Sequence, residues 1–183
     1  MISAAFFLLI AAASEAPAKC SHDFQAMLRL DRNAFDQDMI GGWRSLAASG
    51  CELEAAELIR KWREAHLAED PTLHWHEGQM RANVGQYEEA IVLFEASLDP
   101  ASRQRWGWNL YVDGSIAFLK GDLEALRLAR ERLAVLPAPP ELKKLKDVHG
   151  NPATVRWPMN LHILDAFIRC WGQSYKAAYG CPK

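Results

Sequence analysis

Histidine and glutamate side chains that could bind a metal ion occur close together at one point of this sequence. His74, His76 and Glu77 lie within four residues, and both residue types are ordinary zinc ligands. On a helix, however, residues two positions apart point about 200° away from each other, so the two histidines cannot both reach one ion. The alternative motif, with two histidines four positions apart, does not occur. We therefore predict ordinary helix residues here, with no metal ion and no other cofactor.

Catalytic carboxylates and nucleophiles have only weak candidates. Asp36 with Asp38, and Glu88 with Glu89, are acid pairs, but such pairs are most often surface acids at helix ends. The G-x-S-x-G motif of serine hydrolases does not occur, and the cysteines are better explained as disulfide partners than as nucleophiles. The sequence therefore predicts a protein without catalytic activity.

Two further segments carry unusual residues. Gly41 and Gly42 adjoin within a helical pattern, where they could permit a close helix crossing or a kink. A phosphate-binding loop is disfavoured because helical patterns flank the pair on both sides. The proline-rich stretch 137–157 is predicted to be an inserted loop, and it contains His149 and Asn151. A periplasmic hydrolase of cell-wall or peptide substrates, with its catalytic residues in that loop, remains an alternative.

The four cysteines form an even set, which favours disulfides and an oxidising compartment. Cys20 and Cys51 flank a predicted antiparallel helix pair, so they are the preferred bridge. Cys170 and Cys181 are close in sequence, although two regular antiparallel helices would hold them beyond bridging distance. Three pairings are possible, and none of the spacings is typical of a metal site.

The N-terminus resembles a cleavable export signal. The apolar run 4–13 is too short to span a bilayer, and Ala16-Pro17-Ala18 supplies small residues for cleavage, although a basic segment before the run is missing. We predict a signal peptide over 1–18, a periplasmic or secreted location, and no stable membrane insertion after cleavage. The formal net charge of −2 gives no basic surface for nucleic acid.

Residues 19–183 are predicted to form one all-α domain. Apolar residues recur at helical spacing, and Asp70-Pro71 and Asp99-Pro100 both have the cap-plus-proline pattern of a helix start. Gly50, Gly85 and Gly121 interrupt the helices at intervals of 35 and 36 residues, a period typical of stacked helical hairpins. The faces predicted to be buried include Ala55, Leu58, Ile59, Trp62 and His66; Tyr87, Ala90, Ile91, Phe94 and Leu98; and Leu123, Leu126, Ala129, Leu133 and Leu136.

These units resemble the tetratricopeptide-repeat (TPR) family, whose repeats carry a small residue in the first helix, a glycine turn, an apolar second helix and a closing proline. The middle unit matches at Gly78, Gly85, Tyr87, Ala90, Phe94 and Pro100, and the next at Gly114, Gly121, Leu123, Leu126 and Pro137. The resemblance implies a TPR-like α-solenoid, an array of antiparallel helix pairs with the loop insertion 137–157 before a C-terminal capping helix pair. The repeat-like units cover about 34–68, 71–99, 100–136 and 158–181.

The resemblance also implies that the first helix of each pair lines a concave groove that binds a protein or peptide segment. Aromatic rings would supply contact area there, and amide side chains would pair with a backbone. The aromatic residues could instead pack against neighbouring helices. An inhibitor or immunity-type protein against a secreted effector is a further alternative. The predicted groove residues are Gln37, Arg44, Trp75, Gln79, Asn83, Trp108, Tyr111, Ser115 and Phe118.

Overall fold

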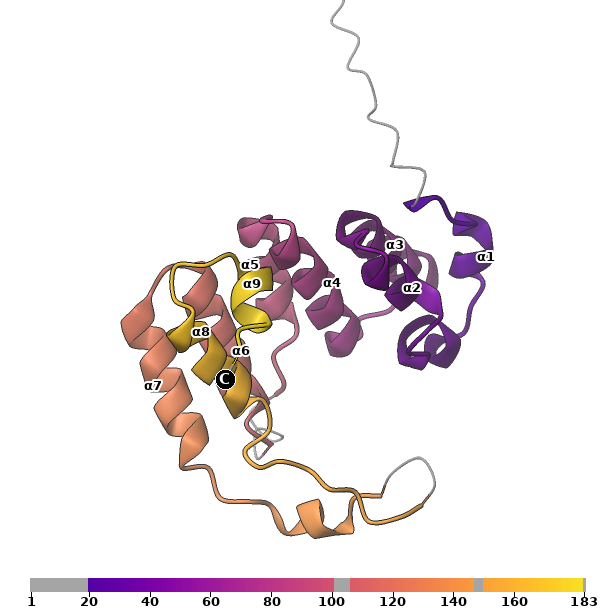
Figure 1. The fold of residues 1–183 in the computed structure, drawn as a ribbon. Coiled ribbons are helices and arrows are strands. Elements are labelled where there is room, and N and C mark those ends of the chain that lie inside the picture. Colours follow the sequence, from indigo (N-terminus) through magenta and orange to yellow (C-terminus); the bar gives the residue numbers. More distant parts are fainter. Residues whose placement is uncertain (1–19, 101–105, 147–149, 183) are drawn as a thin grey trace, which may run out of the picture.

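The computed structural model describes residues 20–100, 106–146 and 150–182, and within them every regular element is helical (Figure 1). This confirms the predicted all-α class. The predicted signal peptide, residues 1–18, lies outside the described residues. No helix in the described part of the chain is long and apolar enough to cross a membrane. The elements are α1 (Phe24–Leu28), the π-helical turn η2 (Asn33–Gln37), α2 (Gly42–Ala48), α3 (Glu52–His66), α4 (Pro71–Asn83), α5 (Tyr87–Ala96), α6 (Trp108–Leu119), α7 (Leu123–Ala134), the 3₁₀ turn η4 (Pro140–Lys144), α8 (Leu161–Arg169) and α9 (Tyr175–Tyr179).

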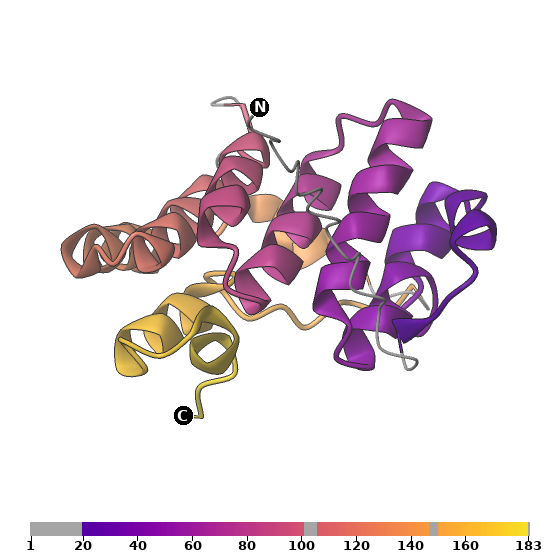
Figure 2. The same ribbon diagram turned by 90° about the horizontal axis from the view of Figure 1, so that it is seen from above.

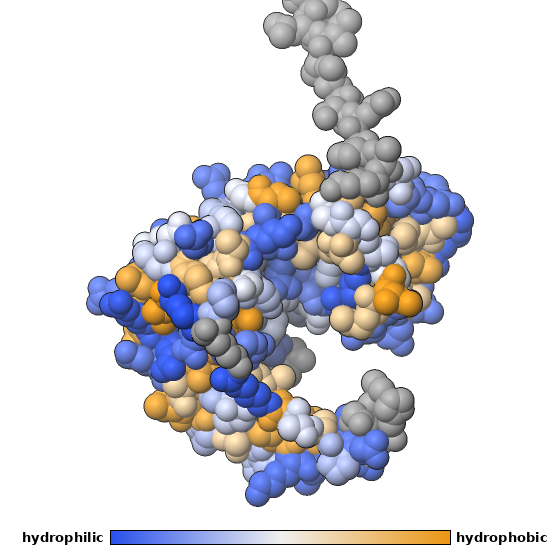
Figure 3. Space-filling view, in the orientation of Figure 1, coloured by the Kyte–Doolittle hydropathy of each residue, from blue (hydrophilic) through white to orange (hydrophobic). Residues whose placement is uncertain are grey.

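Helices that follow one another in the chain pack against one another, α4 on α5 and α6 on α7 most extensively. The chain also returns on itself, because α8 packs on both α6 and α7, and the final helix α9 reaches α4 (Figures 1 and 2). Between α7 and α8 the chain forms an arm that contains η4. Figure 3 shows the surface hollowed between this arm and the N-terminal helices.

The predicted helix breaks are confirmed. Gly50, Gly85 and Gly121 each stand between two helices with positive φ, at 75°, 83° and 70°. Asp70 caps α4 as predicted, since its side chain accepts the backbone N–H groups of Thr72 and Leu73 while Pro71 occupies the first helical position.

The small residues of the first helices allow close packing of paired helices. A Cβ atom at Gly78 would lie 2.7 Å from the ring of Phe94 on α5. A Cβ at Gly114 would lie 2.7 Å from Leu164 on α8 and 3.4 Å from Ala129 on α7. Glycine at both positions therefore lets these helices approach more closely than any larger residue would.

Two apolar clusters form the interior, and α4 contributes to both. The N-terminal cluster gathers around Phe35, Trp62 and Ile59 and includes Leu73 of α4. The second cluster extends from α4 to α9 and includes Trp75 of α4. Trp75 is only 4% exposed, so α4 is buried on opposite sides. This helix is the structural link between the two halves of the molecule.

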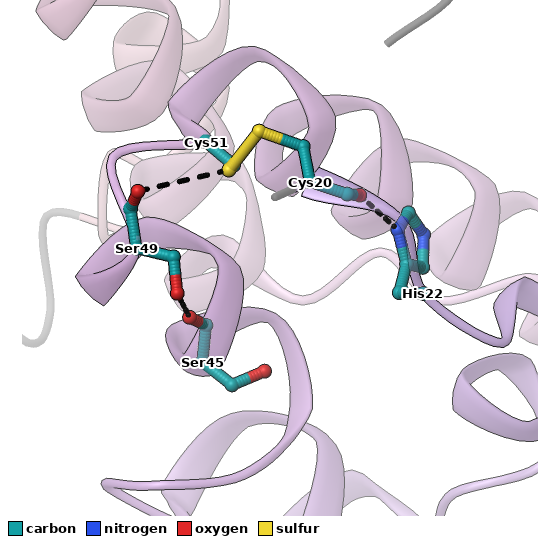
Figure 4. Close-up of a disulfide and its surroundings, with 5 residues drawn as sticks. All are labelled: Cys20, His22, Ser45, Ser49 and Cys51. Atoms are coloured by element: carbon teal, nitrogen blue, oxygen red, sulfur yellow. Dashed lines mark hydrogen bonds between the residues drawn. A yellow bond between two sulfur atoms is a disulfide. The ribbon is translucent and has the colours of Figure 1, made fainter. Parts of the chain in front are cut away.

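Both disulfides are formed, which indicates an oxidising environment. The preferred Cys20–Cys51 bridge is confirmed, with its Cα atoms 5.6 Å apart and both residues buried beside the start of α3 (Figure 4). Cys170 and Cys181 also pair, with Cα atoms 6.2 Å apart. Two long antiparallel helices would have separated these cysteines. Helix α9 is only five residues long, however, and the chain turns back after it, so Cys181 can reach Cys170.

Helix α6 begins at Trp108, and the Asp99 backbone exchanges hydrogen bonds with the side chain of Asn109 in its first turn. The helix start predicted at Asp99-Pro100 leads into residues 101–105, which lie outside the described residues. At Gly41-Gly42 the chain leaves one element and enters another, since η2 ends at Gln37 and α2 begins at Gly42. The reason is steric, because Gly42 has a φ of 51° and lies against the backbone of η2.

Replacing Gly42 with alanine is expected to lower the free energy of unfolding by about 2–3 kcal/mol. The added Cβ would lie 2.0 Å from the Phe35 carbonyl oxygen, at a φ that alanine disfavours. Gly85→Ala is the matched control, since its φ is 83° but nothing lies within 4 Å of the added atom. Urea denaturation of both variants measures the difference, and equal losses would show that the contact with Phe35 has no effect.

Candidate functional site

A cavity of about 450 Å³ opens along one side of α4. Its walls come from elements far apart in the sequence: α2 supplies Arg44, α4 supplies Trp75 and Gln79, and α6 supplies Trp108 and Tyr111. Tyr179 of α9 and Asn160, at the start of α8, also line the cavity. The volume falls within the range of small-molecule and cofactor sites.

Five of the predicted groove residues thus line one cavity, and the others lie elsewhere. Asn83 lines an adjoining cavity of about 320 Å³, which shares Arg44, Gln79 and Tyr179 with the first. Phe118 lies in the second apolar cluster, stacked on Phe167 with ring centroids 4.5 Å apart. Gln37 is exposed beside the N-terminal turn, and Ser115 is fully buried with its hydroxyl donating to the Tyr111 carbonyl.

The aromatic wall is also part of the core. Trp75 stacks on Phe94 at a centroid distance of 4.2 Å and meets Trp108 edge to face at 5.0 Å. Tyr111 is 2% exposed, and burial raises the pKa of its hydroxyl well above the ordinary value, so it remains neutral. Trp108 is half-buried and donates its indole N–H to the Ser97 carbonyl. Of the three predicted aromatic residues at this wall, Trp108 therefore offers the most surface to a ligand.

A buried carboxylate supports the other side of the cavity. Asp36 is fully buried, although the sequence predicted a surface acid; it is one of the predictions that the structure corrects. The indole N–H of Trp43 and Nδ1 of His76 both donate to its Oδ1, at 2.9 and 2.7 Å. Burial alone would raise the pKa of Asp36, but these bonds and the positive charge of Arg32 hold it well below the ordinary range. The group is therefore ionised.

The other members of the candidate acid pairs stand as predicted. Asp38, Glu88 and Glu89 are exposed, the last two in the first turn of α5. Such a position suits the positive end of the helix dipole. The inserted loop 137–157 contains Asn151 among its described residues, whereas His149 lies outside them.

His74 and His76 point to different partners, as their spacing requires. His74 is buried between α3 and α4, where it is hydrogen-bonded to Arg63. Burial, and then the charge of Arg63, lowers the pKa of His74, so the ring is neutral. His76 instead lines the cavity. The two rings therefore do not form a shared site.

Glu77 is the centre of an ionic network in the α3–α4 interface. Its carboxylate is 2% exposed and accepts from Arg63 Nη1 at 2.6 Å and from Arg81 Nε at 3.0 Å. Arg81 also donates to Glu57 of α3 at 2.9 Å. These contacts lie on the side of α4 away from the cavity residues and link α3 to α4.

The sequence reasoning missed seven residues of the lining, among them His76, Asn160 and Tyr179. His76 was considered only as a metal ligand, and Asn160 only as a helix cap. Asn160 does stand at the N-cap of α8, but its side chain makes no capping hydrogen bond and lines the cavity. Tyr179 gave no local signal, because its position depends on the packing of α9 against α4.

No model of a known protein family matches the chain, and neither the curated proteins nor the solved structures gave a match. The geometry of the cavity is therefore the basis for a functional assignment.

Proposed function

We propose that the protein is an exported, non-catalytic interaction module that binds a protein or peptide segment in the cavity along α4. Its architecture is a TPR-like α-solenoid, with the pair α8–α9 as a C-terminal cap. The glycine turns at Gly50, Gly85 and Gly121, which separate successive antiparallel helices at intervals of 35 and 36 residues, support this view of the repeat. The two disulfides support a periplasmic or secreted location.

The observation that carries the proposal is the convergence of Arg44, Trp75, Gln79, Trp108 and Tyr111 on one cavity. These residues come from three helices, and the adjoining cavity with Asn83 extends the same side of α4. Binding sites commonly combine such an aromatic surface with a few amide and charged groups, because rings bury area while polar groups fix orientation. A short peptide segment fits both the chemistry and the size.

Replacing Trp108 with alanine is expected to weaken peptide binding by about 30-fold, equivalent to about 2 kcal/mol. Trp108 is the half-buried aromatic residue of the wall, so its loss removes contact area. Peptides selected against the wild-type protein from a displayed random library serve as probes. Isothermal titration calorimetry with each purified peptide measures the dissociation constant.

Phe118→Ala is the matched control, because Phe118 is an aromatic residue of α6 that does not line this cavity. It should lower the melting temperature and leave peptide affinity unchanged. The proposal fails if the library yields no peptide that binds the folded protein, or if Trp108→Ala binds the selected peptides as tightly as the wild type.

A further inference from the structure

We propose that Arg44 and His76 form an oxyanion-binding subsite in the cavity, which takes a carboxylate, sulfate or phosphate group. The two side chains come from α2 and α4, and both contact Asp36: Arg44 bonds its backbone carbonyl and His76 bonds its buried carboxylate. The subsite does not depend on peptide binding, since a free anion can occupy it.

Both carboxylate oxygens of Asp36 accept hydrogen bonds from groups inside the protein. Its Oδ1 accepts from Trp43 and His76, and its Oδ2 accepts from Arg32 Nη1 at 2.8 Å and from Gln37. Arg32 also bonds Asp70, whose carboxylate caps α4. Asp36 therefore has a charged hydrogen-bond partner other than Arg44.

The contacts of Arg44 fix the orientation of its guanidinium through Nε and through the ring of Trp43. Its Nε donates to the backbone carbonyl of Asp36 at 2.7 Å, and its guanidinium lies 4.4 Å above the ring of Trp43. Its Nη2 is 3.9 Å from Asp36 Oδ1, beyond hydrogen-bond length. The terminal guanidinium N–H groups are thus held in place, and the side chain is 22% exposed at the cavity. A planar fork fixed in this way suits two oxygens of an anion.

His76 supplies the second donor. Its Nδ1 is engaged with Asp36, and the ring is tilted against Trp43 with centroids 5.1 Å apart. The ring also lines the cavity. When the ring is protonated, both nitrogens are donors, so Nε2–H can bind an anion while Nδ1–H keeps its bond to Asp36.

The surrounding charges place the anion at this end of the cavity. Asp99 also lines the cavity, and its backbone is hydrogen-bonded to the side chain of Asn109 on α6. Because a carboxylate repels an anion, the anion is favoured near Arg44 and His76 instead. Thr72 and Gln79 of α4 flank His76 with uncharged polar groups. The titratable and charged side chains that line the cavity with His76 are Arg44, Asp99, Tyr111 and Tyr179, and the carboxylate of Asp36 is bonded to the ring.

Sulfate and acetate are suitable probes because both are anions at pH 5.5. We expect saturable shifts of the His76 ring resonances on titration with sulfate at pH 5.5, measured by ¹H–¹⁵N NMR of the full chain. The same titration with acetate in place of sulfate shows whether a carboxylate is enough to shift the His76 resonances or whether a tetrahedral dianion is required.

Arg44→Met and His76→Gln should each weaken sulfate binding about tenfold or more. Glutamine can still donate to Asp36, so the support is preserved while the charge is lost. The controls His66→Gln on α3 and Arg127→Met on α7 lie outside the cavity and should bind as the wild type does. Melting curves with and without sulfate show that each variant is folded. Unchanged His76 resonances at pH 5.5, or unchanged affinity in folded Arg44→Met, would overturn the proposal.

Discussion

Replacing Glu77 with glutamine is expected to lower the free energy of unfolding by about 3–5 kcal/mol, the usual effect of breaking a buried ion pair. The carboxylate accepts from Arg63 and Arg81 in the α3–α4 interface and is 2% exposed. Arg81 would retain Glu57, but the remaining neighbour of Arg63 across the interface is the neutral ring of His74. The glutamine amide would also place N–H groups against a guanidinium.

The comparison variant is Glu64→Gln, which removes a charged carboxylate from helix α3. Glu64 pairs with Arg60 and Lys61, but its side chain is 51% exposed. Exposed pairs of this kind contribute little to stability, because water and salt screen the charges. Urea denaturation of both variants at neutral pH measures the difference. Similar small losses in the two would mean that the charge of Glu77 is not needed for stability.

Removal of the Cys20–Cys51 bridge in the double variant Cys20→Ala, Cys51→Ala is expected to cost about 3–4 kcal/mol of stability. The bridge joins residues 31 apart and restricts a long loop in the unfolded chain. It also fastens the N-terminal segment to the start of α3 (Figure 4). Equilibrium unfolding in urea under non-reducing conditions measures the loss.

The second bridge provides the comparison. Cys170 and Cys181 are only 11 residues apart, so the same chain-entropy argument gives less than about 3 kcal/mol for Cys170→Ala, Cys181→Ala. A larger loss from this pair than from Cys20–Cys51 would show that the position of α9, rather than loop length, dominates the stability.

The helical hairpins could be predicted because their signals are local. Glycine turns, the Asp70-Pro71 cap and the apolar faces depend on residues within one or two helical turns, and the structure places helices between these breaks. His66 departs from its predicted face because it lies in the last turn of α3, where the ring is exposed. The start of α6 at Trp108 was not predicted, and the contact there between Asp99 and Asn109 joins residues ten apart.

The site could be predicted only in part, for the same physical reason. The resemblance to TPR repeats implied that Trp75 and Gln79 share a groove, and both line the cavity. The pairing of Asp36 with His76 joins residues 40 apart across an interface between η2 and α4, so no local pattern indicates it. Burial of Asp36 was missed as well, since a carboxylate in a polar segment is usually exposed and its partners come from tertiary packing.

The contact of α9 with α4 imposes an order of events during synthesis. A chain made from its N-terminus can form the Cys20–Cys51 loop and the α3–α4 interface early, because all of these residues precede residue 84. The cavity is different, since Tyr179 supplies part of its wall and follows Gln79 by about 100 residues in the chain. Long-range contacts of this kind form late in folding. The cavity along α4 is thus completed only when the last helix of the chain has been made and has packed against α4.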